Sequence, residues 1–152
     1  MKRITEIAIC AALFAGIATA GMAQGGDPVA QRQAAMKGFG ATIGAINAAV
    51  GTSDYATASA KAKELSASVK SLNMMFPAGT SAADGKPTGA KPEVWSNAAG
   101  FKAAVDKAGA DADALVAAAD SKDGAAVTAA VAGFRANCGT CHTAFRGPKP
   151  AA

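Results

Sequence analysis

Residues 127–145, VTAAVAGFRANCGTCHTAF, decide the fold class of this chain. The larger and the sulfur-bearing side chains in this stretch recur at alternating spacings of four and three residues: Val127, Val131, Phe134, Cys138, Cys141 and Phe145. This alternation places them on one face of an α-helix, whereas a half-buried strand would alternate every second residue. The stretch therefore predicts a helix that packs along a single apolar stripe.

Three earlier segments carry the same periodicity. Their stripes are Met36, Phe39, Ile43, Ile46 and Val50; then Tyr55, Ala58, Ala62, Leu65, Val69, Leu72 and Phe76; then Ala98, Phe101, Val105, Ala108, Ala112, Leu115 and Ala119. Helices with such stripes pack at the shallow crossing angle of a bundle. With short connections between them, they predict an all-α, antiparallel, up-and-down four-helix bundle.

Capping and breaking residues predict where each helix begins and ends. Asp27 before Pro28 is typical of an N-cap and a first helical residue, and Pro92 before Glu93 predicts the start of the third helix. Residues 51–54 and 121–124 predict two short turns, Pro77 the end of the second helix, and Gly147 with Pro148 the end of the fourth.

Composition excludes several classes of function. Hydrophobic residues make up 51% of the 152 residues but aromatic residues only 5%, and the abundant alanine favours helices over a β-rich fold. The formal charge of +4 comes from lysines and arginines scattered along the sequence, so it predicts no basic patch and no binding of nucleic acid. A single histidine excludes a zinc enzyme with several His ligands. We expect no enzymatic activity, since no nucleophile with a base and no carboxylate pair is evident.

The N-terminus has the pattern of an export signal. Met1-Lys2-Arg3 is followed by an uncharged apolar run over residues 7–20 and then by small residues. That run is shorter than the roughly 20 residues of a membrane span, and it predicts a signal peptide over residues 1–23. Cleavage after Ala20 also fits, and a retained anchor is the alternative. The mature domain, residues 24–152, has no second apolar stretch, so we expect a periplasmic protein without a membrane span.

The sequence Cys138-Gly139-Thr140-Cys141-His142 is the attachment signature of a c-type haem. Two thiols one helical turn apart can form thioethers with the two vinyl groups of the porphyrin. The histidine that follows is then placed to ligate the iron. The only histidine of the chain stands at this position. We therefore predict one covalent haem c in the bundle core near the C-terminal helix.

Three alternatives compete for the two cysteines. A redox-active dithiol belongs in a βαβ context, for which the sequence has no strand pattern. A zinc site needs four ligands, and the mature chain has no second cluster of them. A disulfide between Cys138 and Cys141 inside a helix is geometrically poor, and it would leave a purely structural bundle.

Several stretches resemble the class II c-type cytochromes, the family of cytochrome c′ and cytochrome c-556. They are residues 134–146 around the motif, 75–81, 91–95, and the first-helix segment 32–37. The family fold is a four-helix bundle whose haem site lies near the C-terminus. The resemblance implies that Cys138 and Cys141 hold the haem and that His142 is the proximal ligand.

The resemblance also implies roles for three polar residues. Arg32, with Gln33 beside it, corresponds to the helix-one position near the haem propionates, which a guanidinium can bind in a bidentate fashion. Arg146 corresponds to the basic residue on the proximal side. Each of the two arginines could instead be a solvated side chain on a helix face.

The role of Met36 distinguishes the two functions that the family resemblance implies. As an iron ligand, Met36 would give a six-coordinate, low-spin haem and an electron carrier with redox partner proteins. As a packing residue, it would leave a five-coordinate haem that binds nitric oxide or carbon monoxide. The run from Met36 to Gly40 favours the first interpretation, with Met74 and Met75 as other sulfur candidates. The resemblance also implies that the chain could form a homodimer through its first two helices, and the sequence does not decide this.

Overall fold

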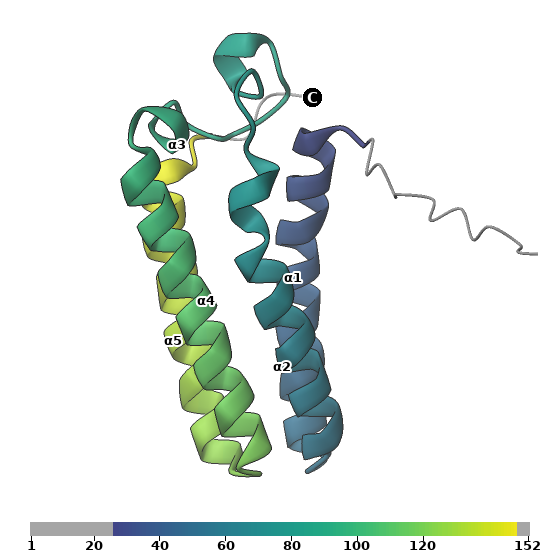
Figure 1. Cartoon of the computed structure of the whole chain (residues 1–152). Coiled ribbons are helices and arrows are strands. Elements are labelled where there is room, and N and C mark those ends of the chain that lie inside the picture. Colours follow the sequence, from purple (N-terminus) through teal and green to yellow (C-terminus); the bar gives the residue numbers. More distant parts are fainter. Residues whose placement is uncertain (1–25, 149–152) are drawn as a thin grey trace, which may run out of the picture.

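The structure is a computed structural model that describes residues 26–148, and the expected signal peptide lies outside the described residues. The long helices are α1 (Pro28–Gly51), α2 (Tyr55–Lys70), α4 (Ala98–Asp120) and α5 (Gly124–Phe145). A short helix α3 (Glu93–Ser96) and the 3-10 turns η1 (Leu72–Met75) and η2 (Ala82–Asp84) connect α2 to α4. Successive long helices run in opposite directions (Figure 1), which confirms the predicted antiparallel bundle.

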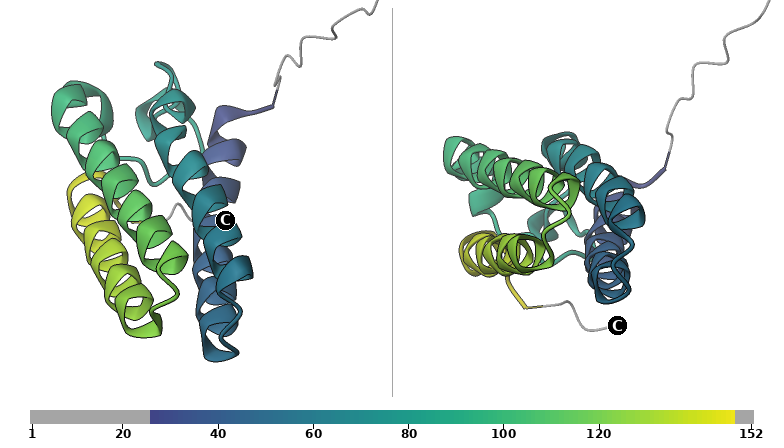
Figure 2. Two further views of the ribbon diagram at one scale, coloured as in Figure 1. Left: turned by 60° about the horizontal axis from the view of Figure 1, so that its bottom comes forward. Right: turned by 90° about the horizontal axis from the view of Figure 1, so that it is seen from below.

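The four long helices stand at the corners of a square in the order α1, α2, α4 and α5, as the end-on view in Figure 2 shows. The most extensive contact is between α2 and α4, and α4 with α5 and α1 with α2 also pack closely. The contact between α1 and α5 is much smaller. The bundle is therefore tightly packed on three sides and loosely closed on the fourth.

Aspartate caps begin three of the long helices. The Asp27 carboxylate accepts a hydrogen bond from the backbone N–H of Val29 at 3.0 Å, which confirms the predicted start of α1. Asp54 caps α2 in the same way, and Asp123 accepts from two backbone N–H groups of α5. Such caps satisfy N–H groups that have no partner within the helix.

Two predicted helix boundaries are wrong. The second helix does not continue to Pro77, because α2 ends at Lys70 and the chain tightens into η1. The third helix does not run on from Pro92, because the chain breaks at Asn97, whose side chain accepts a hydrogen bond from the Gly100 N–H at 3.1 Å and caps α4. Ala98, expected on the apolar stripe, is consequently the exposed first residue of α4.

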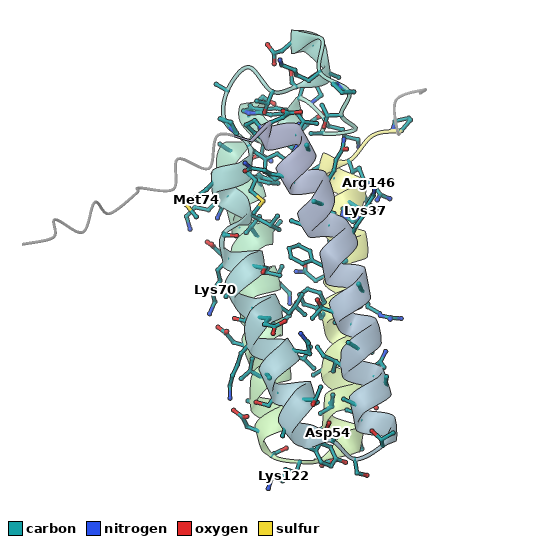
Figure 3. All side chains as sticks on the ribbon, turned by 90° about the vertical axis from the view of Figure 1, so that its right-hand side faces the viewer. Lys37, Asp54, Lys70, Met74, Lys122 and Arg146 are labelled. Carbon is teal, nitrogen blue, oxygen red and sulfur yellow. The ribbon has the colours of Figure 1, made fainter. Side chains whose placement is uncertain are left out.

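We call the half of the bundle with the 51–55 and 120–124 turns the closed end, and the half with α3, η1 and η2 the open end (Figure 3). Ile46, Ala58, Leu115 and Val127 fill the closed end and are 0–1% exposed. The alanines of α2 and α4 are buried there by direct helix contact, so they leave no gap between these two helices. None of the helices within residues 26–148 is both long and apolar enough to cross a membrane.

A second apolar cluster closes the top of the open end, with Leu72, Val94, Phe101, Val105 and Phe145 as its buried members. The Phe101 ring packs edge-on against Phe76 and Phe145, with centroid distances of 4.8 and 5.3 Å. Edge-to-face aromatic pairs of this kind hold fixed relative orientations. The three rings form one apolar wall of the space between α1 and α5.

Candidate cofactor site

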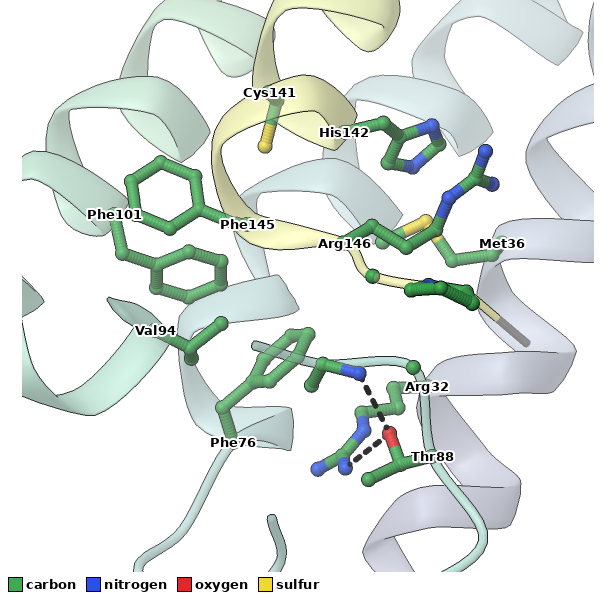
Figure 4. Close-up of a pocket in the computed structure, with 14 residues that line it drawn as sticks. Arg32, Met36, Phe76, Thr88, Val94, Phe101, Cys141, His142, Phe145 and Arg146 are labelled. Carbon is green, nitrogen blue, oxygen red and sulfur yellow. Dashed lines mark hydrogen bonds between the residues drawn. The ribbon is translucent and has the colours of Figure 1, made fainter. Parts of the chain in front are cut away.

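Two adjoining cavities open where α1 and α5 make little contact. Their volumes are about 470 and about 300 Å³, and both are lined by Met36, Cys141 and His142. Figure 4 shows the larger cavity, with the rings of Phe76, Phe101 and Phe145 on one side and Met36, His142 and Arg146 on the other. Volumes of this size are typical of cofactor and ligand sites.

The cysteines of the motif lie one turn apart on α5 and contribute to the cavity walls. Cys141 lines both cavities and Cys138 the smaller one. Both are half-buried, and both thiols are free in the structure, with no disulfide between them. Burial raises the pKa of each thiol. Two neutral thiols at this spacing match the chemistry of thioether formation better than that of a low-pKa redox dithiol.

His142 is half-buried and lines both cavities. Burial lowers the pKa of the imidazole, and the nearby charge of Arg146 lowers it further. Both effects favour the neutral imidazole, which is the form that ligates a metal. Within residues 26–148 no group of three or more His, Cys, Asp and Glu side chains is placed to hold a bare metal ion.

The three methionines in the described part of the chain differ sharply in position. Met36 is half-buried and lines both cavities. Met74 is 80% exposed and points away from the bundle in Figure 3. Met75 packs against the aromatic cluster of the open end but lines neither cavity. Of the three thioethers, only that of Met36 is therefore available to a group bound beside His142.

Arg32 is a buried cation in the wall of the larger cavity, with an exposed fraction of 3%. Its guanidinium donates to the Thr80 hydroxyl and carbonyl at 2.8 and 2.6 Å and to the Thr88 hydroxyl at 2.8 Å. The same group lies 4.8 Å from the Phe76 ring centroid. Burial lowers its pKa, which the charge of Asp27 partly offsets.

No Asp or Glu within residues 26–148 forms an ion pair with Arg32. A buried charge without an opposite charge is costly. A ligand carboxylate in the larger cavity would supply that opposite charge. The position of Arg32 thus fits a group that carries carboxylates.

The other two polar residues implied by the resemblance lie differently. Gln33 is exposed, its side-chain amide donates to the Pro87 carbonyl at 2.9 Å, and it lines neither cavity. Arg146 is exposed and lines the larger cavity, and its backbone N–H donates to the His142 carbonyl at 2.9 Å. The structure therefore brings Arg146 to the cavity and directs Gln33 to the loop.

A short strap of residues 89–91 fixes the end of α5. The Lys91 backbone N–H donates to the Phe145 carbonyl at 2.9 Å, and the Gly147 N–H donates to the Gly89 carbonyl at 2.7 Å. A Cβ on Gly89 would lie 3.1 Å from the Pro148 carbonyl oxygen, a crowded contact that favours glycine at this position. These hydrogen bonds join residues that are 54 and 58 positions apart in the sequence, and no sequence pattern indicated them.

Asn137 is a site residue that sequence reasoning missed. It is 9% exposed, lines the smaller cavity, and its side-chain Nδ2 has no hydrogen-bond partner. Buried polar atoms almost always have a partner, and leaving one unsatisfied costs about 1–3 kcal/mol. The only sequence signal was a polar residue beside the apolar stripe. An orphaned amide in this wall suits a cavity that holds a further group or a water molecule.

The residues of the two cavities thus fit a haem c. They offer two thiols one turn apart, a neutral imidazole, a buried cation for carboxylates and otherwise apolar walls. The disulfide and dithiol alternatives leave the cavities, Arg32 and Asn137 without an explanation.

Comparisons with known proteins agree with this chemistry. A family model described as Cytochrome C′ matches residues 27–146. Cytochrome c-556 of Agrobacterium fabrum is 34% identical over 141 residues, which cover 91% of this chain and 93% of that protein. The crystal structure of cytochrome c′ from Rubrivivax gelatinosus matches 80% of this chain and 95% of its own, with a TM-score of 0.69 and 36% identity. A nitric oxide complex of a cytochrome c prime variant from Alcaligenes xylosoxidans has a TM-score of 0.71 and 30% identity, over 81% of this chain and 95% of that one.

Proposed function

Since the chain belongs to the cytochrome c′ family, whose members carry a covalent haem c, we propose that it is an electron carrier of the bacterial periplasm in which His142 and Met36 ligate the haem iron. The haem supplies a one-electron iron couple. The observation that carries the proposal is the position of Met36, which alone among the three described methionines lines both cavities together with His142.

Each residue has a role that its surroundings support. Cys138 and Cys141 attach the cofactor to α5 through their half-buried thiols. His142 is held neutral by burial and by Arg146, so it can ligate through an imidazole nitrogen. Arg32, anchored by loop hydroxyls, offers its charge to the propionate carboxylates.

Met36 suits electron transfer for two physical reasons. A thioether is a neutral, polarisable ligand that raises the potential of a haem iron. Met36 also lies within the long helix α1, whose N-terminal end is fixed by the Asp27 cap and by the Arg32 contacts. A ligand fixed in this way moves little between oxidation states, and the walls around it are mostly apolar.

The experiment compares Met36→Ala with Met74→Ala in the haem-loaded protein. We expect Met36→Ala to convert a low-spin absorption spectrum to a high-spin one, to lower the reduction potential and to open the iron to carbon monoxide. Met74→Ala is the matched control, because its side chain is 80% exposed, and it should change none of these. An unchanged spectrum in Met36→Ala would refute ligation.

A second candidate function is gas binding at a five-coordinate iron, with Met36 as a packing residue. The smaller cavity and the unpartnered amide of Asn137 favour it, because that amide could donate to a small bound molecule. The nitric oxide complex of the Alcaligenes xylosoxidans relative also supports this alternative. Rapid binding of carbon monoxide to the reduced wild-type protein would favour it over the carrier.

A further inference from the structure

The charged side chains of the bundle are divided between two faces. Every charged residue of α2 and α4 belongs to an ion pair: Lys61 with Glu64, Lys63 with Asp120, Lys70 with Asp113, Lys102 with Asp106, and Lys107 with Asp111. These five are all the ion pairs among residues 26–148. The α2–α4 face is consequently close to neutral.

Apart from the capping residues Asp27 and Asp123 at the helix N-termini, the charged residues of α1 and α5 are all positive. Neither α1 nor α5 contains an Asp or a Glu between its first and last residue. Lys37 on α1, Arg135 on α5 and Arg146 at the end of α5 are exposed, and none of them makes an ion pair among the described residues. Charges that are scattered in the sequence are therefore brought together by the fold, contrary to our expectation of no basic patch.

Two of these three cations line the cavities, and the third neighbours a lining residue. Arg146 lines the larger cavity and Arg135 the smaller one. Lys37 directly follows Met36, which lines both. Figure 3 shows Lys37 and Arg146 on one edge of the bundle and Lys70 on the opposite edge. One carboxylate, that of Asp111 on α4, lies near enough to Cys138 to affect its pKa. This carboxylate is already paired with Lys107 at 2.8 Å.

We propose that the face formed by Lys37, Arg135 and Arg146 is the docking surface for an acidic redox partner protein. The proposal rests on the proposed function, because docking at this face would bring a partner to the loosely closed side of the bundle where the haem fits. Complementary charge raises the rate of encounter and orients the partner. A second copy of this chain would present the same positive face and would be repelled from it.

The test measures how fast two small oxidants of opposite charge oxidise the reduced, haem-loaded protein. Hexacyanoferrate(III) is a trivalent anion, and tris(phenanthroline)cobalt(III) is a trivalent cation. We expect the rate with the anion to fall about tenfold from low to high ionic strength, at the lower end of the range for electrostatic steering. The rate with the cation should rise over the same range.

Two double variants separate the local charge from the net charge. Lys37→Glu with Arg135→Glu reverses the docking face, whereas Lys61→Glu with Lys102→Glu makes the same change in net charge on the α2–α4 side. We expect the first variant to lose or invert the salt dependence and the second to keep most of it. Equal effects in the two variants would overturn the proposal, because net charge alone would then explain the rates.

A binding measurement tests the same face without electron transfer. Poly-L-glutamate stands in for an acidic protein surface, and calorimetry at low salt measures its affinity. We expect the face-reversed variant to lose this binding and the α2–α4 variant to retain it; the opposite order would contradict the docking face.

The two proposals fail in different ways. A high-spin protein that binds carbon monoxide would refute the electron carrier and leave the charge-dependent binding intact. A low-spin protein that reacts with both oxidants at rates independent of salt would refute the docking face and leave the electron carrier intact.

Discussion

The closed end and the open end of the bundle are built from the same heptad pattern but are filled differently. At the closed end, the stripe positions of all four long helices meet in the core, and side chains such as Ile46 and Leu115 are fully buried. At the open end, Met36, Cys138 and Cys141 occupy the same stripes, and they border cavities instead of a packed centre.

The difference shows that periodicity sets the helix positions but not what fills the space between them. Where α2 meets α4, alanines let the helices approach until no space remains. Where α1 faces α5, the helices stay apart, and the walls contain a buried arginine without an acid and an orphaned amide. The core of the closed end is filled by side chains alone, whereas the core of the open end has space for a cofactor.

The largest predicted effect comes from removing the attachment sites. In Cys138→Ser/Cys141→Ser, no thioether can form, so haem should be absent from the protein after denaturing electrophoresis with haem staining. Thr140→Ala, a change at the exposed residue between the two cysteines, should keep the stain. Covalent haem in the double serine variant would contradict the assignment.

Leucine-to-alanine substitutions at the two ends should differ in how their effect on the free energy of unfolding depends on haem. Leu115→Ala at the closed end should cost about 2–5 kcal/mol in the free energy of unfolding, whether or not haem is attached. Leu72 lines the smaller cavity, so Leu72→Ala should cost less in the haem-free double serine protein than in the haem-loaded one. Denaturant titrations measure both. Equal costs for Leu72→Ala in the two forms would mean that the cofactor does not contact this wall.

Arg32→Met should destabilise the open end by about 2–3 kcal/mol, because the Thr80 and Thr88 oxygens lose a charged donor. Arg135→Met is the control, an exposed arginine whose loss should change stability by no more than about 0.5 kcal/mol. Denaturant titration of the haem-loaded variants compares the two. Similar costs would show that the hydrogen bonds of the buried Arg32 guanidinium contribute nothing to stability.

Asn137→Leu should have opposite effects in the two forms of the protein. Without haem, replacing an unsatisfied amide by an apolar group of similar size should stabilise the fold by about 1–3 kcal/mol. With haem attached, the amide gains an acceptor, such as an enclosed water, and the same change should stabilise less or destabilise. Thermal unfolding of both forms decides this, and an identical gain in each would show that nothing accepts from Nδ2.

The fold was largely predictable because its signals are local. The Asp27 cap depends on side chains that neighbour it in sequence, and the apolar spacings extend along single helices. The pattern did not predict the break at Asn97, because Pro92 before Glu93 is typical of a helix start. An asparagine directly before the alanine-rich stripe is nevertheless a readable N-cap.

Two parts of the site were not predictable from spacing. The partners of Arg32 lie 48 and 56 residues away along the chain, on a loop whose path only the folded chain defines. The positive face likewise arises because α1 and α5 become neighbours, while their cations are far apart in sequence. By contrast, the haem-attachment motif could be identified from the sequence, because its members Cys138, Cys141 and His142 lie within about one helical turn.

The most direct measurement of the central claim is the visible absorption spectrum of the purified wild-type protein, oxidised and reduced, with and without carbon monoxide. If Met36 closes the coordination sphere, the spectrum is low-spin in both oxidation states and does not change when the gas is added. A high-spin spectrum that changes on adding carbon monoxide would contradict Met36 ligation and identify an open site for small gases.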